Sequence, residues 1–133
     1  MLLEPASKFE EAVLAKLLEG DLPELELLRA QLQSAQVRRE WTGAGFWTEF
    51  AVEQAAPRLA RRARLQITGV YGHHRDLKAG VGFTLFVEDG AVSSLEGYTY
   101  EEPWPANIGA MQIEQDPTGH QRRVELNRLF HRT

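Results

Sequence analysis

The pattern of apolar and polar positions is most regular between residues 81 and 100, where it predicts a β-hairpin. From Val81 to Val87, apolar residues alternate with smaller or more polar ones, the period of a strand with one buried face. Asp89-Gly90 follows, and this dipeptide fits a two-residue type I′ turn because both central positions of that turn need a positive φ. The segment 91–100 runs back, and Pro103 ends it because proline lacks a backbone donor.

The first 35 residues have helical periodicity instead, and they predict two helices. Ser7 and Glu10 form a capping-box pattern at the start of the first helix, which Gly20 ends. Asp21 is predicted to cap the second helix, with Pro23 in its first turn. The apolar stripes comprise Phe9, Val13, Leu14, Leu17 and Leu18 in the first helix, and Leu25, Leu28, Leu32 and Ala35 in the second.

From residue 37 the period becomes alternating, and the segments 37–42 and 46–52 predict a second hairpin around Gly43-Ala44-Gly45. A three-residue loop places Arg39 opposite Glu49 and Trp41 opposite Trp47, which are favourable cross-strand pairs. A two-residue loop would oppose Glu40 and Glu49, which repel each other. The three-residue loop is therefore the preferred register.

The remainder of the chain adds strands and one helix without any linker that would divide it. The predicted elements are a connection at 53–64, a strand at 65–71, a polar loop at 72–79, a short strand within 108–115, a turn at 116–119 and a helix at 122–130. Residues 1–133 are thus expected to form a single α+β domain, with two N-terminal helices packed on one face of an antiparallel meander sheet.

Composition narrows the classes of function. The net charge of −4 over 133 residues argues against a protein that coats nucleic acid. The chain has no cysteine, which excludes disulfides, thiolate metal sites and thiol catalysis. No apolar run approaches the roughly 18 residues that cross a bilayer, and the N-terminus lacks the basic and apolar regions of a signal peptide. The expectation is a cytoplasmic protein without cofactor, metal or membrane contact.

Glu96 is the most informative candidate for chemistry. If the Asp89-Gly90 turn has two residues, Glu96 lies opposite Phe83 on the face that also carries Leu85 and Val92. A carboxylate on that face needs a partner, so the residue is either a structural ion pair or an acid or base with a raised pKa. A bulge would move it to the other face.

Two other polar groups have plainer interpretations. His73-His74 with Asp76 is interpreted as a solvated polar loop, because adjacent residues on a strand point to opposite faces and no zinc-ligand spacing is present. The arginines at 58–64 lack a phosphate-cradling loop, and they are interpreted as a solvated face that pairs with the acidic first helices. No catalytic motif supports an enzyme class.

Aromatic side chains are concentrated in the two hairpins. Neighbouring strand residues face opposite ways, so Phe46 and Trp47 cannot both enter one core, and some rings must face outward. Exposed aromatic rings beside carboxylates are typical of an interface or of an apolar ligand groove. The candidate binding residues are Trp41, Trp47, Glu96, Tyr98, Tyr100, Glu102 and Trp104.

Two stretches of the chain resemble a group of small, uncharacterised bacterial proteins. The stretches are Arg39-Glu40-Trp41-Thr42-Gly43-Ala44-Gly45-Phe46-Trp47-Thr48 and Leu95-Glu96-Gly97-Tyr98-Thr99-Tyr100-Glu101-Glu102-Pro103-Trp104-Pro105. Together with the leading helix, the resemblance covers most of the chain. It implies no catalytic role for any residue. Some such small proteins accompany toxins as immunity or antitoxin partners, so the resemblance implies a toxin-like partner.

The leading hypothesis from the sequence is therefore that the chain is a non-enzymatic binding protein whose target is another protein. The rival hypothesis is a small-molecule or hydrolytic site lined by Trp41, Glu96, Tyr98 and a histidine. The shape of the aromatic region discriminates between them, because an open patch favours a protein partner and an enclosed pocket with convergent Glu and His favours a ligand.

Overall fold

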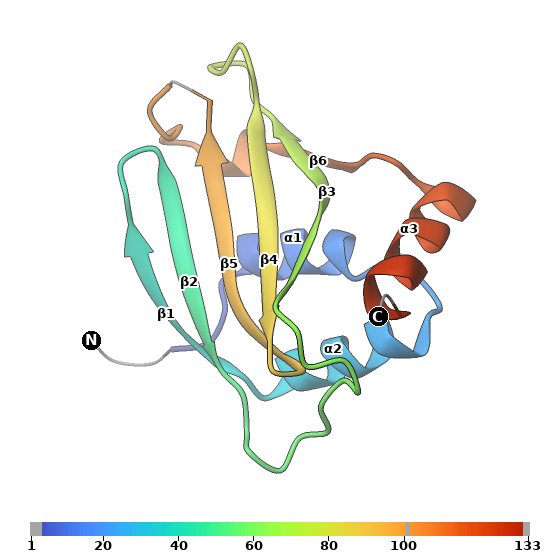
Figure 1. Cartoon of the computed structure of the whole chain (residues 1–133). Helices are drawn as coiled ribbons and strands as arrows, with labels where there is room; N and C mark the ends of the chain where they lie inside the picture. The colour runs from blue at the N-terminus through green and yellow to red at the C-terminus, as the bar shows by residue number, and fades with distance from the viewer. Residues whose placement is uncertain (1–3, 101, 132–133) are drawn as a thin grey trace.

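The computed structural model describes residues 4–100 and 102–131 (Figure 1). Its elements are α1 (Lys8–Leu17), α2 (Pro23–Gln33), β1 (Gln36–Trp41), β2 (Gly45–Ala51), β3 (Leu65–His73), β4 (Val81–Glu88), β5 (Ala91–Thr99), a 3₁₀ turn η1 (Ile108–Ala110), β6 (Gln112–Gln115) and α3 (Gly119–His131). All described strand pairs are antiparallel, so the predicted α+β class with an antiparallel sheet is confirmed. Within the described residues, no helix has the length and apolarity that a bilayer crossing requires.

The sheet has the strand order β1-β2-β5-β4-β3-β6. Its centre, β3-β4-β5, is the predicted meander, but the β1-β2 hairpin joins it through β5. This order follows from the segment 52–64, which crosses one end of the sheet and brings the chain from β2 to β3, three positions away (Figure 1). β2 therefore pairs with a strand that comes much later in the sequence, and the two predicted hairpins become neighbours.

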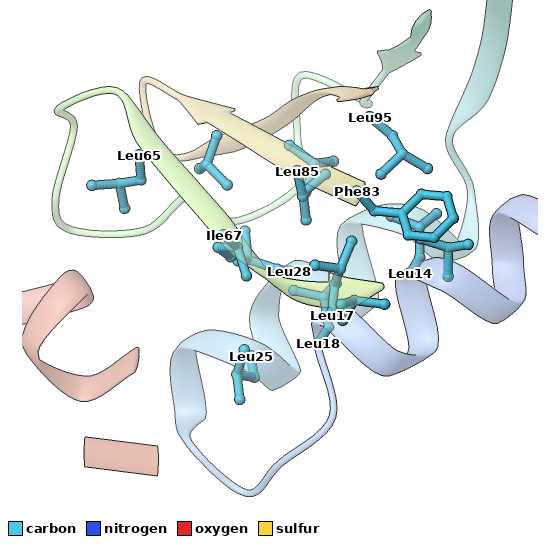
Figure 2. Close-up of a cluster of buried hydrophobic side chains, with 14 of the residues drawn as sticks. Leu14, Leu17, Leu18, Leu25, Leu28, Leu65, Ile67, Phe83, Leu85 and Leu95 are labelled. Atoms are coloured by element: carbon cyan, nitrogen blue, oxygen red, sulfur yellow. The ribbon is translucent and has the colours of Figure 1, made fainter. Parts of the chain in front are cut away.

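The hydrophobic core lies between one face of the sheet and the helices α1 and α2. Figure 1 shows both helices behind the sheet, and Figure 2 shows Leu14, Leu17 and Leu28 directed at Phe83 and Leu85. The β4 residues in this cluster alternate along the strand, as one buried face requires, whereas the spacing in β3 and β5 widens to three residues at an irregularity in the pairing. α3 adds Leu126 and Phe130 to the same cluster. We call this side of the sheet the core face.

The β4-β5 hairpin has the predicted Asp89-Gly90 turn, with positive φ at both residues, but its register contains a bulge. Val87 pairs with Val92, whereas Phe86 already pairs with Ser94. The shift places Leu95 opposite Leu85 on the core face and Glu96 opposite Thr84 on the other face. The expected pairing of Glu96 with Phe83 is therefore wrong. The bulge is favoured by burial, because the unshifted register would have placed the Glu96 carboxylate in the core and left Leu95 outside it.

The register of the β1-β2 hairpin also differs from the predicted one. Trp41 pairs with Phe46 and Arg38 with Glu49, so residues 42–45 form a four-residue turn. The predicted pairs of Arg39 with Glu49 and of Trp41 with Trp47 are absent. The observed register places Val37 opposite Phe50 on the core face, whereas the predicted one would have put Glu49 there. Trp41 and Trp47 consequently lie on opposite faces.

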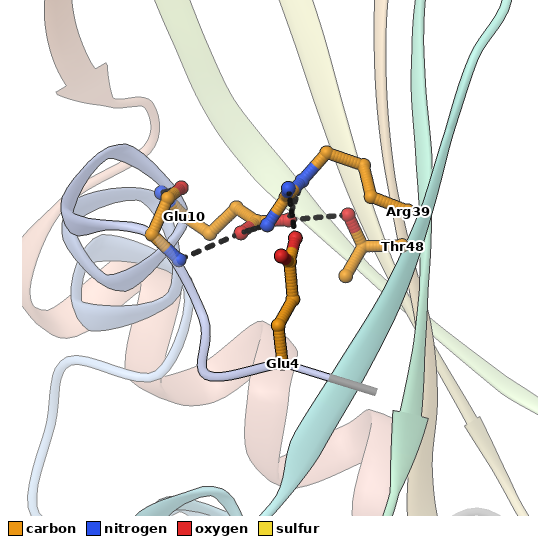
Figure 3. Close-up of polar contacts among 5 residues, drawn as sticks. Glu4, Glu10, Arg39 and Thr48 are labelled. Carbon is orange, nitrogen blue, oxygen red and sulfur yellow. Dashed lines mark hydrogen bonds and ion pairs between the residues drawn. The ribbon is translucent and has the colours of Figure 1, made fainter. Parts of the chain in front are cut away.

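Glu10 connects α1 to the sheet through a buried ion pair (Figure 3). Its carboxylate is 2% exposed and accepts hydrogen bonds from Arg39, from the Thr48 hydroxyl and from the Ser7 backbone N–H. Burial alone would raise the pKa of the Glu10 carboxyl, but these bonds outweigh it and hold that pKa below the ordinary value. The predicted capping box at Ser7 and Glu10 is confirmed, and the same carboxylate also anchors the helix to β1 and β2.

Arg122 of α3 joins three elements. Its guanidinium is buried and donates to the Leu17 carbonyl at the end of α1 and to the Thr68 carbonyl in β3, at 2.8 and 3.0 Å. Burial lowers the pKa of this side chain. Gly69 leaves room for it, since a Cβ at that position would lie 2.6 Å from Arg122 Nη1. The α1 carbonyl supplies the negative end of a helix dipole, which suits a buried cation.

Two predicted polar roles near the helices are wrong. Asp21 does not cap α2, whose N-cap is Leu22 without a side-chain hydrogen bond; Asp21 pairs instead with Arg123 at 2.9 Å. The arginines of 58–64 do not pair with the first two helices. Arg58 and Arg61 donate to backbone carbonyls, and Arg62 and Arg64 pair with residues at the β4-β5 turn.

Candidate functional site

The sheet face opposite the core is the candidate site, and we call it the outer face. In Figure 1 the helices lie behind the sheet or beside its β3-β6 edge. The strand registers define three rows of side chains that cross the outer face from strand to strand. The first row is Gly45, Tyr98, Gly82, Tyr71 and Glu114; the second is Glu40, Trp47, Glu96 and Thr84; the third is Arg38, Glu49, Ser94, Phe86 and Gln66.

In the first row, the Tyr98 ring and the neighbouring Tyr100 ring lie over the backbone of Gly82. A Cβ on Gly82 would lie 2.6 Å from both the Tyr98 and the Tyr100 hydroxyl oxygens, so only glycine admits the two rings there. The rings of Tyr98 and Tyr100 meet edge to face with centroids 5.5 Å apart. Partial burial and the neighbouring Tyr98 hydroxyl raise the pKa of Tyr100 to about 12. The Tyr100 phenol is therefore a neutral hydrogen-bonding group at ordinary pH.

The second and third rows are joined by an aromatic stack. The Trp47 and Phe86 rings lie 5.4 Å apart, and the guanidinium of Arg64 lies 4.8 Å from the centre of the Phe86 ring. Phe86 and Ser94 are buried although they face away from the core. The outer face thus has its own small apolar layer, in which Trp47 is partly exposed.

Charged groups surround this layer. Arg38 pairs with Glu49 at 2.6 Å and Arg64 with Glu88 at 3.3 Å. Beside Trp47, between β1 and β2, a hollow of about 260 Å³ is lined by Arg38, Arg39, Glu40, Trp47 and Glu49. An aromatic centre within a charged rim is the usual anatomy of a protein interface.

The structure divides the seven predicted binding residues into two groups. Trp47, Glu96 and Tyr98 lie on the outer face, and the Tyr100 ring contacts Tyr98 there. The other three residues, Trp41, Glu102 and Trp104, lie elsewhere. Trp41 and Trp104 both pack against Phe46 on the core face, with centroid distances of 5.9 and 5.4 Å, and Trp41 is 59% exposed at the sheet edge.

Glu102 makes a structural contact with the loop before β4. Its carboxylate accepts a hydrogen bond of 2.8 Å from the backbone N–H of Lys78, and it thereby fixes the loop that leads into β4. This contact gives Glu102 a structural role, and its membership of a binding rim stays a prediction.

The two adjacent histidines have different environments. His73 is exposed at the end of β3 and lies 2.8 Å from Glu114. His74 is buried, with Nε2 2.8 Å from the Asn107 carbonyl oxygen and Nδ1 accepting from the Asp76 N–H. The interpretation of both as a solvated loop is wrong for His74, which holds its loop together. Within residues 4–100 and 102–131, no three His, Asp or Glu side chains are grouped to hold a metal ion.

The residues of the rival hydrolytic site do not converge. Trp41 lies on the core face, where it packs against Phe46. Glu96 lies on the outer face because it pairs with Trp47, and Tyr98 lies on the same face because it follows Glu96 by two residues along β5. Neither histidine belongs to the rows that contain Glu96 or Tyr98. The most buried carboxylate, Glu10, already accepts bonds on both oxygens and is a structural anchor.

Most residues of the three rows were not among the candidate binding residues, and Glu40, Tyr71, Gly82 and Phe86 are examples. Phe86 and Gly82 carried a signal, because both fall on the polar half of the alternation that runs from Val81 to Val87. A large apolar residue on that half indicates a second apolar layer. A glycine there indicates a ring lying across the strand.

Comparison of the chain with protein-family models, with curated proteins and with solved structures finds no match.

Proposed function

We propose that this chain is a non-enzymatic protein-binding module and that the outer face is its binding surface. The observation that supports the proposal is the pair of partly exposed rings, Trp47 and Tyr98, on a sheet face that the helices leave open, with the buried Phe86 packed against Trp47. Tryptophan and tyrosine are the residues that most often dominate binding energy at protein interfaces. A tyrosine hydroxyl also offers a hydrogen bond at little conformational cost.

The open shape distinguishes this proposal from a ligand site. A small-molecule site is normally a concave pocket that encloses most of its ligand. The hollow beside Trp47 is small, and its lining residues include neither Tyr98 nor Glu96. The candidate residues instead lie along three strands, an arrangement that suits a broad partner surface.

We extend the proposal to a cytoplasmic partner of the toxin class. This step rests on the resemblance of the segments 39–48 and 95–105 to a group of small, uncharacterised bacterial proteins, because some such small proteins accompany toxins as immunity or antitoxin partners. Within those segments, Glu40, Trp47, Glu96 and Tyr98 belong to the outer face. A toxin gene adjacent to the gene for this chain would support the extension, and protection of cells from that toxin would test it.

The binding surface can be tested with matched tryptophan variants. The tagged chain is cross-linked in the cells that express it, and the recovered partner is purified and titrated by calorimetry. Trp47→Ser should weaken binding by about 2 kcal/mol or more, roughly 30-fold in Kd, as expected for an interface aromatic. Trp41→Ser is the control, since Trp41 is the more exposed tryptophan but lies on the core face.

Thermal melts should first establish that both variants are folded. A partner that binds Trp47→Ser as tightly as the wild-type chain, or that is lost only with Trp41→Ser, would refute the outer face as the binding surface.

A further inference from the structure

The second row of the outer face places one carboxylate on each side of the Trp47 indole. The row runs from Glu40 on β1 through Trp47 on β2 to Glu96 on β5, and the three residues are direct cross-strand neighbours. The Cβ atoms of such neighbours lie roughly 4.5–5.5 Å apart, which is close enough for both carboxylates to act on one group bound at the ring.

These two carboxylates differ from the others on the outer face. Glu49, Glu88 and Glu114 pair with Arg38, Arg64 and His73, respectively. None of the ion pairs found among the described residues includes Glu40 or Glu96. Glu49 and Glu88 are compensated by arginines, and Glu114 lies at the β6 edge beside a histidine, so among the described residues the uncompensated negative charge of the β1-β2-β5 part of this face lies on either side of Trp47. It has the same sign as the net charge of −4.

The hollow beside the indole provides a place for a cation on the Glu40 side of the ring, while Glu96 lies on the β5 side and outside the lining. Two arginines contribute to its lining, but both are engaged: Arg38 is bound to Glu49, and the Arg39 guanidinium extends to the core face, where it binds Glu10. Of the charged residues that line the hollow, Glu40 is absent from the ion pairs of the described residues. An indole face attracts cations through its quadrupole, and a nearby carboxylate adds to this attraction.

We propose that the outer face docks a basic protein segment and that an arginine or lysine side chain of this segment binds against Trp47, between Glu40 and Glu96. The choice of partner rests on charge complementarity, because Glu40 and Glu96, which have no ion-pair partner among the described residues, are both acidic and flank an aromatic ring. This inference rests on the proposed function and names the chemistry of its partner.

A peptide titration tests the inference without the cellular partner. The probe is an acetylated and amidated peptide of alternating arginine and glycine, and the readout is the indole N–H resonance of Trp47, assigned with Trp47→Phe. The matched peptide carries citrulline, which keeps the shape of arginine but lacks its charge. The arginine peptide should shift the Trp47 resonance, and its affinity should fall with rising salt.

Charge-neutral variants locate the cation. Glu40→Gln and Glu96→Gln should each weaken the arginine peptide about 2- to 5-fold, as the loss of one exposed ion pair implies. Glu114→Gln is the control, because this carboxylate lies on the same face but at the β6 edge, beside His73. Glu114→Gln should leave the affinity within about 1.5-fold of wild type. Three strand spacings of about 4.8 Å separate β6 from β5, which is more than the Debye length of about 8–10 Å over which exposed charges interact.

Equal binding of the arginine and citrulline peptides would overturn the inference, and so would an equal loss with Glu114→Gln. The result is separable from that of the proposed function. If Trp47→Ser abolishes binding of the cellular partner while Glu40→Gln and Glu96→Gln leave both partner and peptide binding unchanged, the binding surface stands and the basic partner is refuted. If the arginine peptide binds as expected but the cellular partner binds Trp47→Ser as tightly as the wild-type chain, the outer face binds basic segments and the proposed surface for the cellular partner is refuted.

Discussion

Arg38 and Arg39 are adjacent in the sequence, yet the structure predicts very different consequences when each is replaced by methionine. Arg39 points to the core face and binds the buried Glu10, whereas Arg38 points outward and pairs with Glu49. The side chains of Arg38 and Glu49 are 51% and 50% exposed, while that of Arg39 is 16% and that of Glu10 is 2% exposed. Methionine keeps the length and apolar stem of either arginine.

The expected magnitudes follow from these environments. Arg39→Met leaves the Glu10 carboxylate buried with only the Ser7 N–H and the Thr48 hydroxyl as donors. Breaking a buried pair in this way costs about 3–5 kcal/mol, and the partial exposure of Arg39 favours the lower end of that range. Arg38→Met should cost about 0–1 kcal/mol, the usual value for an exposed pair. The double variant Glu10→Leu/Arg39→Met should be more stable than Arg39→Met alone, since it leaves no unpaired charge.

Urea unfolding at pH 7 measures these differences as changes in the midpoint. The pH dependence provides a second check. The folded-state pKa of Glu10 is lowered, so the stability from its ionised form is present above the unfolded pKa of about 4.3 and is lost as the pH falls through the folded pKa. The difference in unfolding free energy between the wild-type chain and Arg39→Met should therefore shrink below about pH 4.

Two results would refute this reasoning. The first is an equal loss of stability in Arg38→Met and Arg39→Met, which would mean that the observed β1-β2 register does not hold in solution. The second is a difference between wild type and Arg39→Met that is constant down to about pH 3, which would mean that Glu10 is not the group that Arg39 stabilises.

Two further predictions concern the tyrosine cluster and the buried Gln31. Gly82→Ala should displace the Tyr98 and Tyr100 rings and lower the unfolding free energy by about 1–3 kcal/mol. The pKa of Tyr100 should then fall from about 12 toward that of free tyrosine. Spectrophotometric titration of tyrosinate measures this pKa, and an unchanged titration curve would contradict the prediction. Gln31→Leu should cost about 1–3 kcal/mol, because the Gln31 amide donates to the Pro57 and Gly90 carbonyls and accepts from the Val92 N–H, and the variant leaves the buried Val92 N–H without this acceptor while Gly90 keeps only its bond from the Leu59 N–H. A urea midpoint equal to that of wild type would show that water replaces the lost bonds.

The sequence alone determined most of the local structure. Alternation and helical periodicity act over a few residues, so the helices at the N-terminus, the strands of both hairpins and the Asp89-Gly90 turn follow from the local pattern. The capping box at Ser7 follows for the same reason, because its two hydrogen bonds join residues three positions apart. The α+β class with an antiparallel sheet needed nothing more than these elements in this order.

Only the tertiary structure decided which face each strand residue occupies. A shift of one residue exchanges the two faces of a strand, and the pattern near the turns allowed more than one register. The four-residue turn at 42–45 and the bulge near Ser94 were selected because they bury Phe50 and Leu95 and keep Glu49 and Glu96 out of the core. Those two choices separated Trp41 from Trp47 and placed Glu96 beside Trp47.

The pairing of β2 with β5 is likewise beyond local reasoning. It joins residues about 50 positions apart, such as Trp47 and Glu96, and no short-range pattern encodes such a contact. The candidate site exists only through this pairing, because Glu40, Trp47 and Glu96 come from three strands. The sequence supplied the chemistry of these side chains, and the burial of a single core face decided that they meet.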